Sequence, residues 1–273
     1  DNNTAVGYFA LIANTTGHSN VAVGTSALAA NTTGQDNIAM GKGTLDANTT
    51  GSSNTGIGHD VLTSNTTASG NTAVGYAALL LNTTGAEHVA IGYNALAANT
   101  TGAGNTAVGY AALDANTTGE QNTAIGDWAL SASTTAHFNV AVGNNALDAN
   151  TTGASNVGVG KDALGANTTG AGNTALGYNA AGSVSTGGTN VAIGYQALKD
   201  TTATTTGSNN IGIGTNVRAA SATGDNHIVI GHDIDTSASA VAIGKSGNKI
   251  QNSFDTNATW TRYSDQNLKT NIN

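Results

Sequence analysis

The tripeptide Asn-Thr-Thr is the most frequent sequence in this chain that could carry chemistry, because Asn-x-Thr is the acceptor for N-linked glycosylation. A structural interpretation competes with glycosylation, since asparagines that recur at a fixed spacing can stack their amides into a hydrogen-bonded ladder. We favour the ladder, and the glycosylation state of these loops stays open. The tripeptide occurs in nine of the first ten copies of a repeat, at Asn14, Asn31, Asn48, Asn65, Asn82, Asn99, Asn116, Asn150 and Asn167.

Other residues that could do chemistry are sparse. The six histidines show no metal-ligand spacing, so we expect them in loops or at the surface. Asp46, Asp114 and Asp148 share one repeat position but form no calcium-binding pattern. The chain has no cysteine, which excludes disulfides and thiolate metal sites. We see no paired carboxylates, phosphate loop or catalytic triad, and we therefore expect no metal, no cofactor and no enzymatic activity on other molecules.

The composition also restricts the partners. Only 9% of the residues are charged, against roughly 25% in average globular proteins. The net charge is −8 without a basic patch, which argues against nucleic acid and anionic membrane surfaces as partners. No apolar run approaches a transmembrane length, so we expect no membrane insertion. This composition fits an extracellular or virion rod.

The pentapeptide Asn-x-Ala/Gly-Val/Ile-Gly sets the frame that positions all these residues. Its first residue, Asn or His, recurs every 17 residues from position 3 to position 190, and looser copies begin at 210, 227 and 240. Below, positions 1 to 17 of the repeat are counted from this residue. A strict period of this length indicates a solenoid, in which each unit forms one coil. We expect an all-β, parallel β-solenoid of about fifteen 17-residue coils.

The pentapeptide alternates in the manner of a β-strand. Positions 2 and 4 carry mostly Thr, Val or Ile, whereas position 3 is almost always Ala or Gly. Alternation of period two places positions 2 and 4 on one face of a strand and position 3 on the other. We expect positions 2 and 4 to form the core with the leucine of position 9. The small residues of position 3 would then face a neighbouring chain, and the predicted trimer interface is Ala22, Ala39, Gly56, Ala73, Ala90 and Ala107.

Glycine fills position 5 in all fifteen units. Glycine is needed where φ is positive or where two backbones approach closely, so we expect each coil to turn a corner there. The return loop is then Asn-Thr-Thr-Gly. Tyrosine recurs at position 6, where it could stack on sugars, although packing against the next coil is the commoner outcome. The corner glycines that we single out are Gly7, Gly24, Gly41, Gly58, Gly75, Gly92 and Gly109.

The pentapeptide resembles the head repeat of YadA-type trimeric autotransporter adhesins, for example in 19–24 and 190–194. The resemblance covers residues 3–244. It implies a left-handed parallel β-roll with three identical chains around one axis. The 17-residue coil is longer than that family's usual repeat, and the added length lies in the Asn-Thr-Thr-Gly loop, so no binding surface is carried over.

The C-terminal end, Ser264-Asp-Gln-Asn-Leu-Lys-Thr-Asn-Ile272, resembles the start of the S74-type intramolecular chaperone of phage tail fibres and endosialidases. That family cuts itself off after templating trimer assembly. The resemblance implies that Ser264 is the nucleophile, Asp265 follows the cut and Lys269 is the base. We expect three segments: 1–247 as a solenoid fibre, 248–263 as a transition, and 264–273 as the truncated start of the chaperone.

Together these features predict a structural fibre protein, a trimeric tail-fibre or adhesin shaft at the virion or cell surface. Its partners would be its own copies and an unknown host receptor, such as a surface glycan. The first alternative is a bacterial trimeric adhesin head that binds matrix or cells. The second is an extracellular fibril or an ice-binding, Thr-rich solenoid.

Overall fold

The computed structural model describes residues 2–199, 205–219, 223–236, 240–253 and 261–263. Regular structure in these residues is entirely β-strand, without helix. The chain divides into two compact units, residues 1–144 and 145–273. Each unit is a stack of coils in which one short strand per coil pairs with the strand of the next coil.

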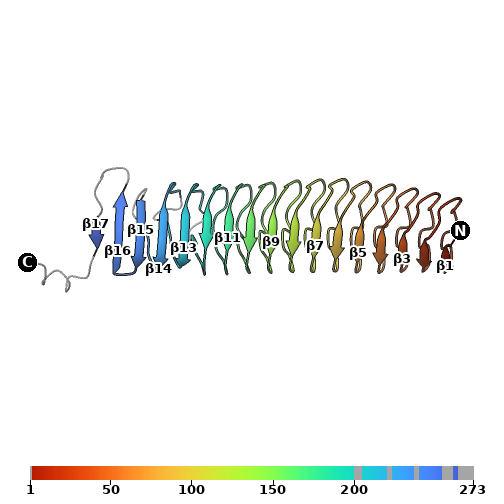
Figure 1. Ribbon diagram of the computed structural model, residues 1–273, viewed down its shortest axis with the longest axis horizontal. Helices are drawn as coiled ribbons and strands as arrows, with labels where there is room; N and C mark the ends of the chain where they lie inside the picture. Colours follow the sequence, from red (N-terminus) through yellow and green to blue (C-terminus); the bar gives the residue numbers. More distant parts are fainter. Residues whose placement is uncertain (1, 200–204, 220–222, 237–239, 254–260, 264–273) are drawn as a thin grey trace, which may run out of the picture. The chain divides into compact units, whose positions relative to one another are not determined.

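The first unit carries nine strands of three residues each. Consecutive strands are parallel and pair at equal repeat positions, as in Ala22 with Ala39, and Figure 1 shows them as a row of short arrows side by side. The strands are β1 (Thr4–Val6), β2 (Val21–Val23), β3 (Ile38–Met40), β4 (Thr55–Ile57), β5 (Thr72–Val74), β6 (Val89–Ile91), β7 (Thr106–Val108), β8 (Thr123–Ile125) and β9 (Val140–Val142).

The second unit continues the pattern and then ends it. Strands β10 to β15 are parallel, but β16 pairs with β15 in the antiparallel sense and β17 pairs likewise with β16. The parallel pairing thus ends with β15. The strands are β10 (Val157–Val159), β11 (Thr174–Leu176), β12 (Val191–Ile193), β13 (Ile211–Thr215), β14 (Ile228–His232), β15 (Ala240–Lys245), β16 (Asn248–Ser253) and β17 (Thr261–Tyr263).

The prediction of an all-β parallel solenoid is confirmed. Among the described residues the parallel strands bound about fourteen coils, one fewer than expected, because the last parallel strand closes no further coil. Most coils have 17 residues. The step from Val191 to its partner Ile211 is longer, and the step from Ile228 to Val241 is shorter.

The core of each coil is thin and built from small residues. After the first coil, the alanine of position 3, the alanine of position 8 and the leucine of position 9 are buried, as Ala90, Ala95 and Leu96 illustrate. Leucine at position 9 was predicted to line the core, and it does. The β-branched residues of positions 2 and 4 are half-buried or exposed instead, as in the strand Val89–Ile91. The predicted assignment of the two strand faces is therefore wrong.

The predicted trimer interface needs the corresponding correction. Side chains at position 3 point into the coil of their own chain, where Ala22, Ala39, Ala73, Ala90 and Ala107 are 0% exposed. A column that is buried within its own coil leaves no surface for another chain. Gly56 occupies the same interior position, because a Cβ built there would lie 2.6 Å from Cγ2 of Thr44.

The glycines of position 5 directly follow the strand residues and stand where the chain turns. Their φ angles lie between 123° and 149° in all fifteen units, a region that residues with a Cβ rarely adopt. Close approach adds a second requirement. A Cβ on Gly109 would lie 2.5 Å from the carbonyl oxygen of Gly126 in the next coil, so even a methyl group does not fit this corner.

Candidate functional site

The outward face of the strands carries a row of large apolar side chains. In the first unit Met40, Ile57, Ile91 and Ile125 occupy position 4 and are 39–43% exposed. The second unit repeats the row with Leu176, Ile193, Ile213 and Ile243, at 37–49%. We call these position 4 residues the outward apolar row. Apolar surface that continues from coil to coil marks an interaction site rather than ordinary surface.

Two asparagine ladders run through the coils beside the core, one at position 1 and one at position 12. At position 1, Asn37 donates its backbone N–H to Oδ1 of Asn20 at 3.0 Å. At position 12, Nδ2 of Asn48 donates to Oδ1 of Asn31 at 2.9 Å. Both ladders also donate to the carbonyl of Gly51, so the loop glycine ties them together.

The ladder explains the Asn-Thr-Thr tripeptides. Their asparagines Asn31, Asn48, Asn65, Asn82, Asn99, Asn116, Asn150 and Asn167 are 0% exposed. An amide that is buried and hydrogen-bonded inside the folded coil is not presented as a glycosylation acceptor. The structure thus favours the ladder interpretation for this column.

His88 takes the place of asparagine at position 1 and is completely buried. Its Nδ1 accepts the backbone N–H of Asn105 at 3.1 Å. Burial lowers the pKa of His88 from 6.5 to about 4, against an opposing hydrogen bond with the backbone of Gly102. His227 occupies the same position in the second unit and is also buried. The expectation that all six histidines lie in loops or at the surface is wrong for these two, and their place in the asparagine column was the signal.

The three aspartates of position 10 have perturbed acidities. Partial desolvation raises the pKa of Asp46, Asp114 and Asp148, and the nearby charge of Asp60 adds to the effect at Asp46. Backbone hydrogen bonds oppose the rise at Asp114 and Asp148. No group of three or more His, Cys, Asp or Glu suited to a metal ion occurs in the described part of the chain. We therefore interpret these three aspartates as partly buried surface residues.

A column of aromatic rings lies on the surface of the first unit at the corner after the strand. The rings are stacked except at its end, where Trp128 is tilted by 58° from Tyr110. Successive ring centroids are 5.6, 5.1, 5.3 and 5.2 Å apart. The tyrosine rings are nearly parallel, with interplanar angles of 8° to 10°. We call this group the aromatic column, and it consists of His59, Tyr76, Tyr93, Tyr110 and Trp128.

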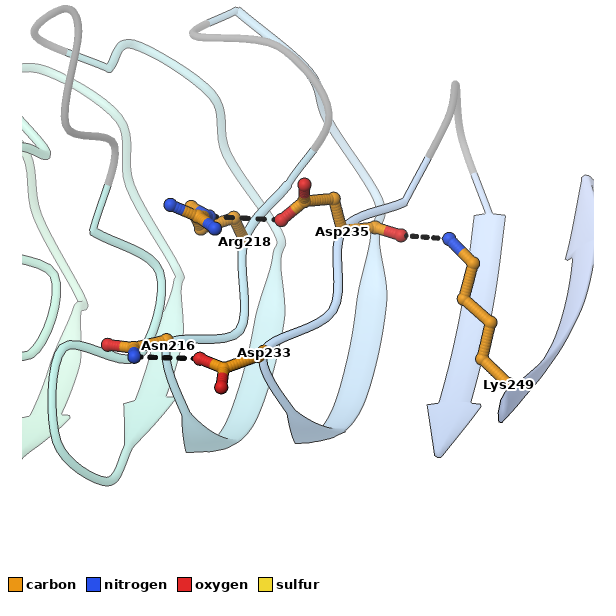
Figure 2. A network of polar contacts seen from close by, with 5 residues as sticks. All are labelled: Asn216, Arg218, Asp233, Asp235 and Lys249. Carbon is orange, nitrogen blue, oxygen red and sulfur yellow. Dashed lines mark hydrogen bonds and ion pairs between the residues drawn. The ribbon is translucent and has the colours of Figure 1, made fainter. Parts of the chain in front are cut away.

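The second unit has a shorter stack and a polar network. Tyr178 and Tyr195 stack at 5.2 Å, with Nζ of Lys161 at 5.9 Å from the Tyr178 ring. Figure 2 shows polar contacts that join consecutive coils near β16, among them Arg218 with Asp235 at 3.0 Å. Lys249 of β16 reaches the backbone carbonyl of Asp235 at 2.6 Å (Figure 2). Surface pairs of this kind contribute little stability each, and we assign them to fastening β16 onto the coils.

The threonines of the return loop behave differently at positions 13 and 14. Thr32 at position 13 donates its hydroxyl to the carbonyl of Thr49 in the next coil at 3.0 Å. Thr33 at position 14 is exposed in a bend of the backbone. Ice binding needs a flat array borne on strands, and a single exposed column in a bend gives no support to that alternative.

The predicted cleavage residues Ser264, Asp265 and Lys269 lie outside the described residues. The C-terminal resemblance therefore rests on its sequence. No helix in the part of the chain that the structure describes is long and apolar enough to cross a membrane.

The chain was also compared with known proteins. No protein-family model, no curated protein and no solved structure matches it. The proposals below therefore rest on the geometry, on the repeat and on the two sequence resemblances described above.

Proposed function

We propose that this chain is a segment of a homotrimeric attachment fibre at a virion or cell surface. The observation that carries the proposal is the outward apolar row, which each unit carries on the outward face of its own strands. Single exposed apolar residues are normal on protein surfaces. Position 4, however, is apolar in every coil, with valine or isoleucine in the coils between the members of the row, and such a regular surface favours a partner that matches its period.

A second and third copy of the same chain match that period best. An apolar residue at position 4 recurs once per coil, and neighbouring strands in a sheet lie about 4.8 Å apart. A partner without this period would meet the row at only a few coils, whereas an identical solenoid would meet it at every coil. Closed cyclic symmetry is the usual way for identical chains to share such a face. The resemblance to trimeric adhesin heads favours three chains.

The attachment role follows from what the chain offers. Its core holds small apolar residues and hydrogen-bonded amides, and the described residues form no metal site. A stack of identical coils spans distance and displays surfaces, so we assign it the role of a shaft that presents a receptor-binding surface or tip. A bacterial adhesin head would share these properties and differ in what it contacts.

We further propose that the peptide bond between Ser264 and Asp265 is a maturation site. The proposal rests on the resemblance of the C-terminal sequence, with Ser264 as nucleophile and Lys269 as base. A neutral lysine can accept the hydroxyl proton of a serine nucleophile. In a longer form of the chain with a complete domain after the motif, mass spectrometry should find two fragments. Ser264→Ala should give one uncut product, and a cut Ser264→Ala chain would contradict the assignment.

The assembly is tested by light scattering on the natural chain. We expect the mass of three chains, and a monomer with well-formed β-structure by circular dichroism would contradict the fibre proposal. Two chains would leave the apolar row as an interface but overturn the trimer.

A further inference from the structure

The aromatic column has properties that packing alone does not require. Tyr76, Tyr93 and Tyr110 are 46–47% exposed, and Trp128 is 44% exposed. Side chains that serve only to seal a corner would be expected to bury more of their surface. The tyrosine rings overlap face to face along the coils, so solvent reaches their edges and the part of each face that the next ring leaves uncovered.

The spacing of the rings is fixed by the backbone. Each tyrosine follows a corner glycine, and hydrogen bonds between coils hold these corners, as in the 2.9 Å bond from the N–H of Gly109 to the carbonyl of Ile91. The rings are therefore held at 5.1 to 5.6 Å without any ligand. Binding to a pre-arranged surface costs little ordering entropy.

That spacing is close to the length of one hexose in an extended 1,4-linked polysaccharide. Such a chain, laid along the coils, would place one sugar against each ring. The C–H groups of a sugar ring can pack against the exposed edges and the uncovered part of each aromatic face, and the phenol groups can donate to and accept from sugar hydroxyls. Contacts that are weak one at a time then add along the column.

The charges around the column indicate what kind of polysaccharide it accepts. Residues 1–144 contain a single Lys or Arg, Lys42, which occupies the column's repeat position in the coil before His59. The N–H of Asp60 donates to the backbone carbonyl of Lys42 at 2.9 Å. Asp60 and Asp127 stand beside the column, where Asp60 pairs with His59 and Asp127 accepts the backbone N–H of Tyr110. A polyanion would meet these carboxylates with only Lys42, at one end of the column, to offset their charge, so acidic glycans are disfavoured.

We propose that the aromatic column is a lateral binding strip for an uncharged, extended 1,4-linked polysaccharide lying along the coils. This goes beyond the attachment role of the fibre, and it does not rest on that role or on the number of chains. It requires only that the column stays exposed in the assembled protein.

Binding is tested on the whole chain with soluble hexasaccharides. Cellohexaose and chitohexaose are extended and uncharged, maltohexaose has the same linkage positions but a coiled shape, and a hyaluronan hexasaccharide is charged. Trp128 reports binding through its fluorescence, and Trp260→Phe removes the other tryptophan of the chain. We expect saturable binding of one or both extended glycans and much weaker binding of the maltohexaose and hyaluronan probes.

Variants locate the site. Tyr93→Ala, in the middle of the column, should weaken binding about twofold to twelvefold if one ring contact is worth about 0.5–1.5 kcal/mol. Tyr93→Leu keeps bulk but removes the ring and should weaken binding similarly, which guards against loss of packing in the alanine variant. Tyr8→Ala is the matched control, because Tyr8 is exposed but lies outside the column, and it should leave the affinity unchanged.

Four results would overturn the proposal. These are no binding of either extended hexasaccharide by the folded chain, equal binding of maltohexaose, an affinity that Tyr93→Ala and Tyr93→Leu leave unchanged, and a fall in oligomer mass with either Tyr93 variant. The last would mean that another copy of the chain covers the column. The two proposals can fail separately. If the Tyr93 variants lose glycan binding but keep the oligomer mass of the natural chain, the binding strip is supported and the assembly is unaffected.

Discussion

The ring of His88 accepts the backbone N–H of Asn105 at 3.1 Å, in the place where the other coils use an asparagine side-chain oxygen, such as Oδ1 of Asn20 for Asn37. The opposite nitrogen, Nε2, faces the Gly102 carbonyl and lies 3.2 Å from Nδ2 of Asn99. The ring must therefore be neutral and carry its proton on Nε2. Nδ1 then keeps the lone pair that accepts the N–H of Asn105, and Nε2–H can donate to the carbonyl of Gly102. One asparagine ladder thus contains a titratable member.

This arrangement predicts a loss of stability in acid. The pKa of His88 is about 4 in the folded chain and 6.5 ordinarily. Between these values the unfolded chain binds more protons, so stability is fully present above about pH 6.5 and falls as the pH drops toward 4. The total loss is at most about 3 kcal/mol, at 1.36 kcal/mol per pKa unit. Thermal unfolding midpoints at pH 7.5 and 4.5 measure it.

His88→Asn is the informative variant, because it restores the residue of the neighbouring coils. It should remove most of this acid sensitivity while leaving the midpoint at pH 7.5 nearly unchanged or higher. His18→Asn changes an exposed histidine and should keep the natural pH dependence. An equal fall in midpoint for the natural chain and for His88→Asn would show that other groups cause the acid effect.

The second prediction concerns a gap in the other ladder. Ser133 stands where the preceding coils have asparagine, and its side chain is too short to continue the ladder. Within the described residues, Oδ1 of Asn116 and Oγ of Ser133 are buried without a hydrogen-bond partner. Ser133→Asn should supply a donor to Asn116 and stabilise the chain by about 1 kcal/mol.

Urea unfolding checks the gain, with Thr135→Asn as control, because Thr135 is exposed in the same loop. The control should change stability by less than about 0.5 kcal/mol. A Ser133→Asn chain less stable than the natural one would mean that the coil has closed over the gap and no longer has room for an amide.

The sequence was a good guide to the coil and a poor guide to which strand face lies inside. The 17-residue period predicted the parallel strands, the corner glycines and the buried leucine of position 9, because each depends on the backbone repeat. The alternation of small and large residues along each strand correctly predicted that its two faces differ. The error was to assign the larger residues of positions 2 and 4 to the interior. The interior is too narrow for them: at Gly56, a Cβ would already lie 2.6 Å from Cγ2 of Thr44 and 3.4 Å from Cγ1 of Val61.

The backbone of the position 9 leucines was also beyond prediction. Leu28 has φ of 51° and Leu96 has φ of 55°, although this left-handed region costs an ordinary residue roughly 1–2 kcal/mol. Hydrogen bonds to the next coil offset this conformational cost. The N–H of Leu28 donates to the carbonyl of Thr44 at 3.1 Å, and the N–H of Leu96 donates to the carbonyl of Ala112 at 3.0 Å. Local propensity cannot reveal a conformation that is stabilised by a residue 16 positions away. The aromatic column was likewise visible only as separate tyrosines.

The third prediction tests the glycine corner. Gly109→Ala forces a Cβ against the carbonyl of Gly126 at a φ of 140°, so we expect a loss of several kcal/mol from strain and displaced backbone. Gly104→Ala is the matched control, since its φ is 67° and the added Cβ would meet only Cγ of Gln121 at 3.4 Å. It should cost about 1 kcal/mol. Chemical unfolding of both variants decides the matter, and equal losses would mean that the corner is no tighter than an ordinary turn.

The last prediction separates the coil interior from the interface, and it uses two adjacent residues of β6. Ala90 is 0% exposed inside its coil, whereas Ile91 belongs to the outward apolar row and is 39% exposed. Ala90→Glu buries a carboxylate in the core of a single chain, which costs several kcal/mol, so it should disrupt the coil itself.

Ile91→Glu leaves the coil intact but sets a charge against its copies across the proposed interface. Circular dichroism should therefore show lost β-structure for Ala90→Glu, and light scattering should show a folded chain of reduced mass for Ile91→Glu. If Ile91→Glu assembles like the natural chain while Ala90→Glu yields a folded monomer, then the copies meet through position 3 after all, and the strand faces are reversed in the assembled protein.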